Sequence, residues 1–140
     1  MQVVLDSNVY IFALEPFGKT ECEAVLDEIV DHPTRYRVRA SRTIIDEVGR
    51  NLAPDRLKDF WSFLNALAIH PDEDWQVPFE LGEKYTALGL KSGDAFIAAY
   101  AEWAGVECLV TENRDFLDKV PLVFAVLRSS AFLRRCKSGQ

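Results

Sequence analysis

The segment most informative about the fold class is Val3-Val4-Leu5-Asp6-Ser7-Asn8, near the beginning of the chain. Its three apolar residues do not alternate with polar ones, which is typical of a short strand buried on both faces of a parallel sheet. The three polar residues that follow are types that cap a helix, and apolar residues then recur at helical spacing as far as Ala13. The chain therefore opens with a strand, a polar turn and a helix.

Strands and helices continue to alternate along the rest of the chain. Residues 35–40 alternate arginine with apolar residues, so a strand there would carry three arginines on one face. Gly105 is expected to end the buried helix that starts near Asp94, because glycine readily adopts the left-handed backbone that closes helices. The other expected helices span residues 20–32, 44–52, 57–68, 79–88 and 130–135, and the other expected strands span 106–110 and 122–127.

Short apolar strands that alternate with helices predict a three-layer α/β/α sandwich around a mostly parallel central sheet. The 140 residues suit one domain, and no repeat or linker divides them, so we expect a single domain over residues 1–140. A hydrophobic content of 49% provides enough apolar surface for a core, which excludes a disordered chain.

Composition also excludes several classes of function. The chain has 16 basic and 22 acidic residues, and this net charge of −6 disfavours a uniformly basic nucleic-acid coat or an anionic-membrane binder. Its three cysteines show no CxxC spacing, so neither a disulfide framework nor a zinc knuckle is indicated. No apolar run approaches the roughly 18 residues of a membrane span, and no signal peptide is recognisable before the first strand. We therefore expect a cytoplasmic protein with reduced thiols.

Four acidic residues are candidates for a functional site, although each also has an ordinary structural explanation. Asp6 and Asp94 stand where residues cap helices. Glu47 could face solvent from its helix, and Asp115 lies in a turn, where aspartate is common. In a parallel sheet, however, ligands bind at the carboxyl ends of the strands, and both Asp6 and the turn at 111–115 are expected there.

Carboxylates that gather at one edge of a sheet repel one another, so they either share protons or hold a hard divalent cation. No histidine occurs in the segments that carry these acids. This argues against zinc, which usually takes nitrogen or sulfur ligands. The pattern therefore favours a magnesium or manganese site.

Four motifs that contain these acids occur in order along the chain, and together they resemble the PIN-domain ribonucleases. The motifs are Leu5-Asp6-Ser7-Asn8-Val9, Ile44-Ile45-Asp46-Glu47-Val48, Gly93-Asp94-Ala95-Phe96-Ile97-Ala98-Ala99-Tyr100 and Leu109-Val110-Thr111-Glu112-Asn113-Arg114-Asp115-Phe116. The likeness covers nearly the whole chain. Within that family, the chain is similar to the VapC-like toxins of type II toxin–antitoxin pairs.

The resemblance implies a catalytic and metal-binding quartet for Mg²⁺ or Mn²⁺, formed by Asp6, Glu47, Asp94 and Asp115. It also implies supporting roles for Asn8 and Thr111, and Asn113 stands where some members of the family have a further acid. Asp46 or Glu112 would replace its neighbour if the match were shifted by one residue. Helix geometry favours Glu47, because Ile44 and Val48 bracket its face.

The function implied by the resemblance is a Mg²⁺-dependent endoribonuclease that leaves 5′-phosphate and 3′-hydroxyl ends, with an antitoxin protein as its partner. PIN domains are often homodimers, and the apolar helices at 24–30 and 57–68 carry more large side chains than one sheet face requires. We therefore expect a homodimer. The alternative is a catalytically silent PIN-like module that binds RNA or docks a partner.

An acidic protein with an acidic site needs a local basic surface to hold RNA. Arg35, Arg37 and Arg39 supply one candidate surface, and the basic residues between 128 and 137 supply a second. The alternative explanation for the three arginines is an edge strand protected by charge. The acidic stretch 72–74 lacks the ligand spacing of a calcium loop, so we interpret it as solvated.

Overall fold

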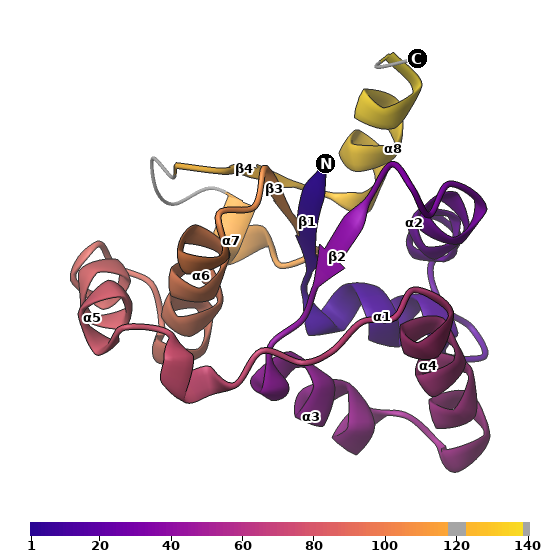
Figure 1. Ribbon diagram of the computed structural model, residues 1–140, viewed down its shortest axis with the longest axis horizontal. Helices are drawn as coiled ribbons and strands as arrows, with labels where there is room; N and C mark the ends of the chain where they lie inside the picture. Colours follow the sequence, from indigo (N-terminus) through magenta and orange to yellow (C-terminus); the bar gives the residue numbers. More distant parts are fainter. Residues whose placement is uncertain (118–122, 139–140) are drawn as a thin grey trace.

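A computed structural model describes residues 1–117 and 123–138 of the chain (Figure 1). Its centre is a sheet of four parallel strands in the order β2-β1-β3-β4, which confirms the predicted α/β/α class. The strands are β1 (Gln2–Leu5), β2 (Arg37–Arg39), β3 (Cys108–Val110) and β4 (Ala125–Leu127). The last strand was expected to begin at residue 122, which lies outside the described residues.

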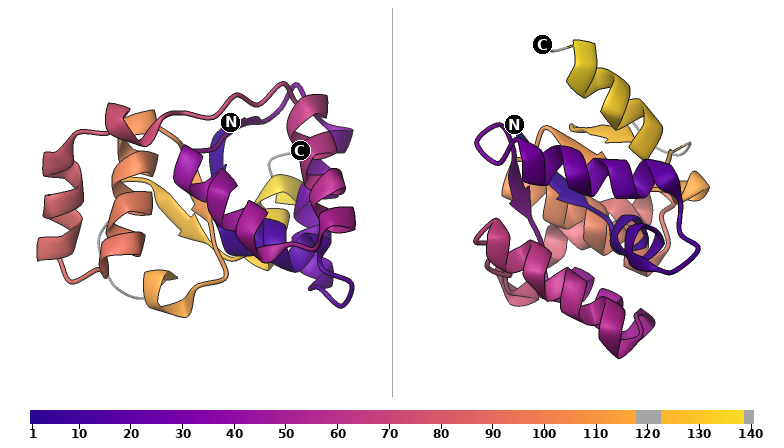
Figure 2. Two further views of the ribbon diagram at one scale, coloured as in Figure 1. Left: turned by 90° about the horizontal axis from the view of Figure 1, so that it is seen from below. Right: turned by 90° about the vertical axis from the view of Figure 1, so that its right-hand side faces the viewer.

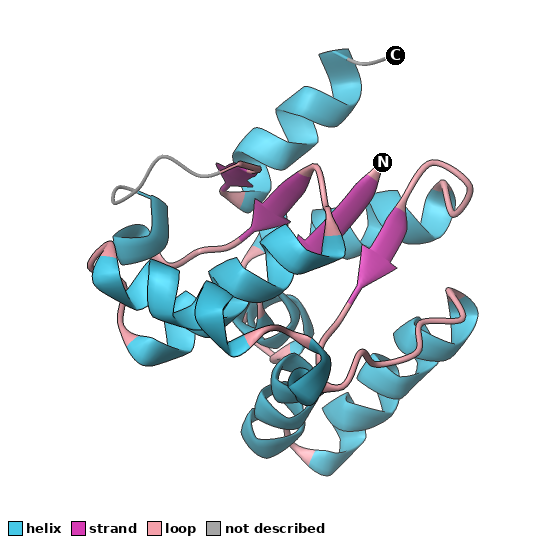
Figure 3. Ribbon diagram, turned by 60° about the vertical axis from the view of Figure 1, so that its left-hand side comes forward, coloured by secondary structure: helices cyan, strands magenta, loops and turns pink. Residues whose placement is uncertain are grey.

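Helices cover both faces of the sheet (Figures 1 and 2). On one side lie α1 (Ser7–Leu14), α2 (Thr20–Asp31) and α8 (Ser129–Ser138), and on the other side lie α5 (Phe79–Ala87) and α6 (Ser92–Ala104). The connections from β1 to β2 and from β2 to β3 run in opposite directions along the sheet. Right-handed crossovers therefore place their helices on opposite faces, with the strands between them (Figure 3).

Two further helices, α3 (Arg42–Asn51) and α4 (Pro54–Ala66), lie beyond the carboxyl ends of β1 and β2, where α3 packs against α1 (Figure 1). The remaining elements are η1 (Asp74–Gln76) and α7 (Arg114–Leu117). α4 begins at Pro54, three residues earlier than expected, because proline is well suited to the first turn of a helix. Gly105 closes α6 with a φ of 69°, as predicted. None of the described helices is long and apolar enough to span a membrane.

The core is built around β1 and β3, the two central strands. Val3, Val4 and Leu5 are completely buried, as is the whole of β3. Helix α6 presents the small buried residues Ala98, Ala99 and Ala101, which let it pack closely on its neighbours. The two buried strands therefore hold the polar residues that follow β1 and β3 side by side.

Tyr10 on α1 packs in this core but buries a polar group there. Its ring packs edge-on against Phe60 and Phe63 of α4, with ring centroids 5.1 and 5.7 Å apart. Its buried hydroxyl has no hydrogen-bond partner among the described residues. We expect Tyr10→Phe to raise the free energy of unfolding by about 1 kcal/mol, because it removes a buried polar group that is left unsatisfied. Urea unfolding at equilibrium measures the change.

Tyr85 provides the matched control for this substitution. It is equally buried, but its hydroxyl donates to the carboxylate of Glu102 at 2.5 Å. Tyr85→Phe should therefore lower the free energy of unfolding by about 1 kcal/mol. If both substitutions destabilised the protein, the Tyr10 hydroxyl would have a partner, and our interpretation would be wrong.

Candidate functional site

Asp6 lies at the junction between β1 and α1, and only 7% of it is exposed. One of its carboxylate oxygens accepts the backbone N–H of Ser7 at 2.8 Å, which caps α1. The other oxygen accepts the hydroxyl of Thr111 at 2.8 Å and the side-chain amide of Asn8 at 3.4 Å. The carboxylate is thus held in one orientation at the carboxyl end of a central strand.

The turn after β3 is joined to the turn after β1 by the side chains of Asn8 and Thr111. Asn8 Nδ2 donates to Thr111 Oγ1 at 3.3 Å, and Asn8 Oδ1 accepts the N–H of Glu112 at 3.1 Å. Thr111 Oγ1 also accepts the N–H of Asn113 at 3.1 Å, so its own proton is directed toward Asp6. Both side chains therefore act on the position of Asp6.

A cleft of about 580 Å³ opens beside Asp6. Glu47 lines it from α3 and Asp94 lines it from the first turn of α6, together with Asn113. Asn113 Nδ2 donates to both carboxylate oxygens of Asp94, at 3.2 and 3.3 Å. The structure thus brings three of the four predicted acids to one cleft at the carboxyl ends of β1 and β3.

The fourth predicted acid, Asp115, lies at the margin of this arrangement. It is exposed on α7, and its side chain does not line the cleft. Its backbone N–H donates to Asn113 Oδ1 at 3.0 Å, which ties α7 to the residue that contacts Asp94. Membership of Asp115 in a metal site stays a prediction.

Burial and like charge act together on two carboxyl groups of the cleft. The pKa of Asp6 is raised by its burial first, and then by the negative charges of Glu47 and Asp94. The pKa of Asp94 is raised by burial first, and then by the charges of Asp115 and Glu47. The hydrogen bonds that both groups accept oppose these shifts. The ionised carboxylates are therefore an unfavourable arrangement that a cation would relieve.

The structure also distinguishes the predicted acids from the acidic residues next to them in sequence. Asp46 is exposed and does not line the cleft, whereas Glu47, one residue further along α3, does. Glu112 is engaged elsewhere, because its carboxylate accepts the N–H of Ser129 at 2.9 Å and pairs with Lys19 at 3.6 Å. Glu47 is therefore the acid that α3 presents to the cleft.

Sequence reasoning missed several residues of the cleft. Thr43 and Asn51 line it one turn before and one turn after Glu47, on the same face of α3. Their spacing of four residues is a signal that the sequence already contained. Ile11 and Phe12 of α1 add an apolar wall, which the sequence did not distinguish from ordinary core.

The chemistry of the cleft suits a hard divalent cation. Its three carboxylates offer the oxygen ligands that Mg²⁺ and Mn²⁺ prefer. Among the described residues, no group of three or more His, Cys, Asp or Glu side chains is arranged to hold a metal ion as it stands. Mg²⁺ usually keeps several of its waters, so a site with few direct protein ligands fits this ion.

The three arginines predicted to contact RNA lie away from this cleft. They line a separate cavity of about 680 Å³ along β2, and none of its lining residues lines the acidic cleft. The carbonyl of Arg35 accepts the N-terminal ammonium at 2.8 Å, and Arg37 lies opposite Gln2 of β1. Arg39 pairs with Asp72 at 3.0 Å. RNA contact by these residues stays a prediction.

Comparison with known proteins assigns the class of this chain. Residues 3–121 match the PIN domain model, and the chain belongs to the PIN domain family. PIN domains are generally nucleases, and PIN nucleases generally use divalent metals.

Two solved structures are similar to this one across almost their whole length. PAE2754 from Pyrobaculum aerophilum is 22% identical over 99% of both chains, with a TM-score of 0.60. FitAcB from Neisseria gonorrhoeae is 22% identical over 91% of this chain and 98% of the other, with a TM-score of 0.57. No similar sequence was found among curated proteins. At this identity the structural likeness establishes the fold.

Proposed function

We propose that the protein is a Mg²⁺- or Mn²⁺-dependent endoribonuclease. The observation that carries the proposal is the cleft in which Asp6, Glu47 and Asp94 converge, where burial and neighbouring negative charges raise the pKa of Asp6 and of Asp94. Membership of the PIN domain family supports a nuclease function. RNA as the substrate is favoured by the sequence motifs that resemble PIN-domain ribonucleases.

Asp6, Glu47, Asp94 and Asp115 would hold the metal ion. Bound there, the ion would act as a Lewis acid toward the scissile phosphate and lower the pKa of a coordinated water. Asp6 provides a fixed oxygen, because Ser7 and Thr111 determine its orientation. Asp94 and Glu47 face the cleft from two different helices, so they could hold the cation from two sides. A carboxylate with a raised pKa, as in Asp94, is also suited to accept a proton from water.

An antitoxin partner is the second part of the proposal, and a groove between α2 and α4 supports it. The groove encloses about 400 Å³, and its floor includes the buried side chains of Leu26 and Phe63. Its rim carries Glu23, Asp27 and Asp59. An amphipathic segment with apolar residues on one side and Lys or Arg at its edges fits these features. The same two helices carry the predicted homodimer contact, which stays a prediction.

Removing and restoring the metal tests the enzymatic proposal. Protein treated with EDTA should not cleave RNA, and millimolar Mg²⁺ or Mn²⁺ should restore cleavage with 5′-phosphate products. The ion should also raise Tm, because it binds only the folded state. A concentration a hundredfold above Kd stabilises by about 2.7 kcal/mol, which corresponds to roughly 5–10 °C for a domain of this size.

Calcium and a metal-free RNA-binding assay serve as controls. Calcium should raise Tm with little cleavage, because it is larger and tolerates irregular coordination. Protein that retained RNA without cleaving it in any metal would favour the catalytically silent module. If no divalent ion changed the Tm, the proposal that the cleft binds a metal ion would be contradicted.

A further inference from the structure

The acidic stretch 72–74, which we call the strap, is held by specific contacts rather than being a solvated loop. It follows α4 and crosses toward the α5–α6 pair (Figure 1). Its first residue, Asp72, forms a bridge with the residues at the start of α3. Its N–H donates to the carbonyl of Ala40, and its carbonyl accepts the N–H of Arg42, both at 2.9 Å. The prediction of a solvated loop is therefore wrong, because its partners lie about thirty residues away in sequence.

The strap holds the first turn of α3. Asp74 accepts the backbone N–H of Thr43 at 3.1 Å, and its other carboxylate oxygen accepts the Thr43 hydroxyl. Backbone N–H groups in the first turn of a helix have no partner within the helix, so this carboxylate acts as a cap. Thr43 itself lines the acidic cleft, four residues before Glu47. Asp74 therefore helps to position the face of α3 that carries Glu47.

The strap also holds α6, the opposite wall. The buried hydroxyl of Tyr100 on α6 donates to Asp72 Oδ2 at 2.5 Å. Arg39 Nε donates to the same oxygen at 3.0 Å, and Arg39 Nη2 forms an ion pair with it at 3.0 Å, which fixes the Asp72 side chain. α6 carries Asp94 at its beginning. One short segment is therefore attached to the helix of Glu47 and to the helix of Asp94.

The two helices that form the walls of the cleft, α3 and α6, make few direct contacts with each other. Among the described residues, α3 packs mainly against α1 and α6 packs mainly against α5. We propose that the strap is a positioning element that sets the separation of Glu47 from Asp94, and that Asp74 and Tyr100 thereby determine how tightly the cleft holds a divalent cation. This inference rests on the proposed function. Metal affinity typically falls about 10–100-fold when a residue that holds a metal ligand in position, without touching the ion, is removed.

The experiment measures Mn²⁺ affinity by calorimetry and, separately, the Tm of the metal-free protein. Asp74→Ala should weaken Mn²⁺ binding about 10–100-fold. Asp74→Asn should recover most of the affinity, because an amide oxygen still accepts the Thr43 N–H. Tyr100→Phe releases the strap from α6 without touching α3, and it should also weaken Mn²⁺ binding.

Glu102 offers a matched control. Its carboxylate also accepts a tyrosine hydroxyl, from Tyr85 at 2.5 Å, and the ammonium of Lys84 at 2.8 Å, but it links α6 to α5. Glu102→Ala should therefore lower the metal-free Tm and leave the Mn²⁺ affinity unchanged. The two measurements together separate a general loss of stability from a displaced cleft wall.

Two outcomes contradict the inference in distinguishable ways. If the original protein binds Mn²⁺, and Asp74→Ala and Tyr100→Phe lower Tm without changing its affinity, the strap is only a structural brace. Should Asp74→Ala fail to fold, Tyr100→Phe and Asp74→Asn decide the question in the same way. If the original protein binds no Mn²⁺, the proposed function fails and the strap's role in metal binding fails with it.

Discussion

Asp6→Asn should reduce RNA cleavage by at least about a hundredfold while the protein remains folded. The substitution removes the carboxylate charge that the cation needs and keeps the size of the side chain. A hundredfold loss corresponds to about 2.7 kcal/mol of transition-state stabilisation. Asp94→Asn, which alters the opposite wall of the cleft, should have an effect of similar size. Initial rates on a defined RNA at saturating Mg²⁺ measure both.

The metal-free Asp6→Asn protein should not lose stability, although it loses activity. The raised pKa of Asp6 means that the folded protein disfavours the ionised carboxylate, so above that pKa the ionised group lowers the free energy of unfolding. Asn removes this charge and can still accept the N–H of Ser7. Metal-free Asp6→Asn should therefore melt at the same temperature as the original protein, or at a higher one. The increase in Tm on adding Mg²⁺ should be smaller.

Asp46→Asn is the control for charge. Asp46 precedes Glu47 on α3 but is exposed and outside the cleft, so its substitution should leave the cleavage rate within about twofold. Equal losses at Asp46 and Asp6 would indicate a general charge effect. Near-normal cleavage by both Asp6→Asn and Asp94→Asn would contradict the assignment of the active site.

The second large effect concerns the proposed antitoxin. We expect its inserted segment to place an Arg or Lys at the acidic cleft, because a guanidinium can bridge two carboxylates and replace the charge of the metal. Inhibition should then compete with Mg²⁺. The apparent inhibition constant should rise about tenfold for each tenfold increase in Mg²⁺ above its Kd. Cleavage assays at several concentrations of Mg²⁺ and of a candidate antitoxin measure this dependence.

Replacing the basic residue of the antitoxin by Ala should weaken inhibition roughly 30-fold or more, about 2 kcal/mol, and leave the apolar contacts in place. Equal inhibition at every Mg²⁺ concentration would contradict the proposed competition. So would an inhibitory segment that contains no basic residue.

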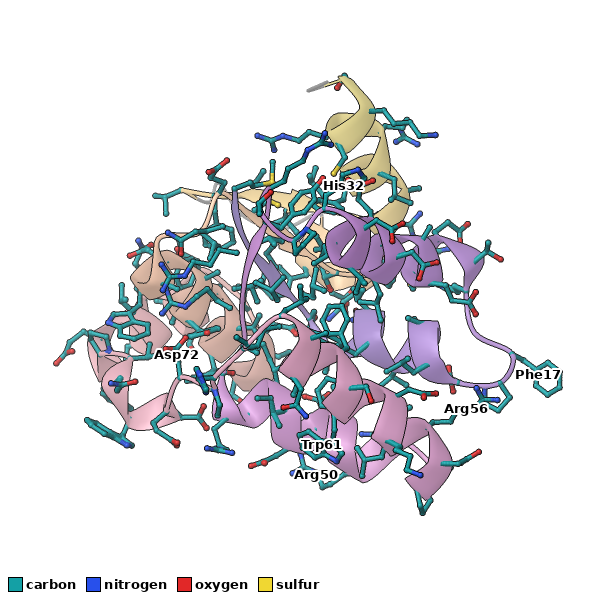
Figure 4. The ribbon with its side chains drawn as sticks, turned by 45° about the vertical axis from the view of Figure 1, so that its right-hand side comes forward. Phe17, His32, Arg50, Arg56, Trp61 and Asp72 are labelled. Carbon is teal, nitrogen blue, oxygen red and sulfur yellow. The ribbon has the colours of Figure 1, made fainter. Side chains whose placement is uncertain are left out.

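The rim of the α2–α4 groove can be tested from the side of this chain. Asp27→Lys and Asp59→Lys reverse exposed charges beside the groove, and each should slow antitoxin association about tenfold without changing cleavage. Asp31→Lys is the control, because Asp31 is also exposed on α2 but does not line the groove. Trp61 and Arg50 lie on the outer surface of α4 and α3 (Figure 4), where substitutions should have little effect. Unchanged association after both reversals would place the antitoxin elsewhere.

Local sequence patterns were enough to predict the class of the fold and the edge of the sheet where the acids lie. Buried strands, helix caps and the closing Gly105 depend on residues within a few positions of one another, so local patterns predict them. Asp6 and Thr111 follow the two central strands, and parallel strands bring their carboxyl ends to one edge. These features require no knowledge of how distant segments pack.

Which side chains meet depends on how distant segments of the chain pack together. A shift of one residue turns a helix by about 100°. Helix geometry already favoured Glu47 over Asp46, but which face of α3 reaches the cleft depended on how α3 packs against α1. Asp115 lies at the margin of the cleft because α7 directs it there. Asp72 and Asp74 find their partners about thirty residues away, and Arg39 pairs with Asp72. Such contacts form between segments joined by long connections, and the packing of whole helices, rather than any local pattern, brings them together.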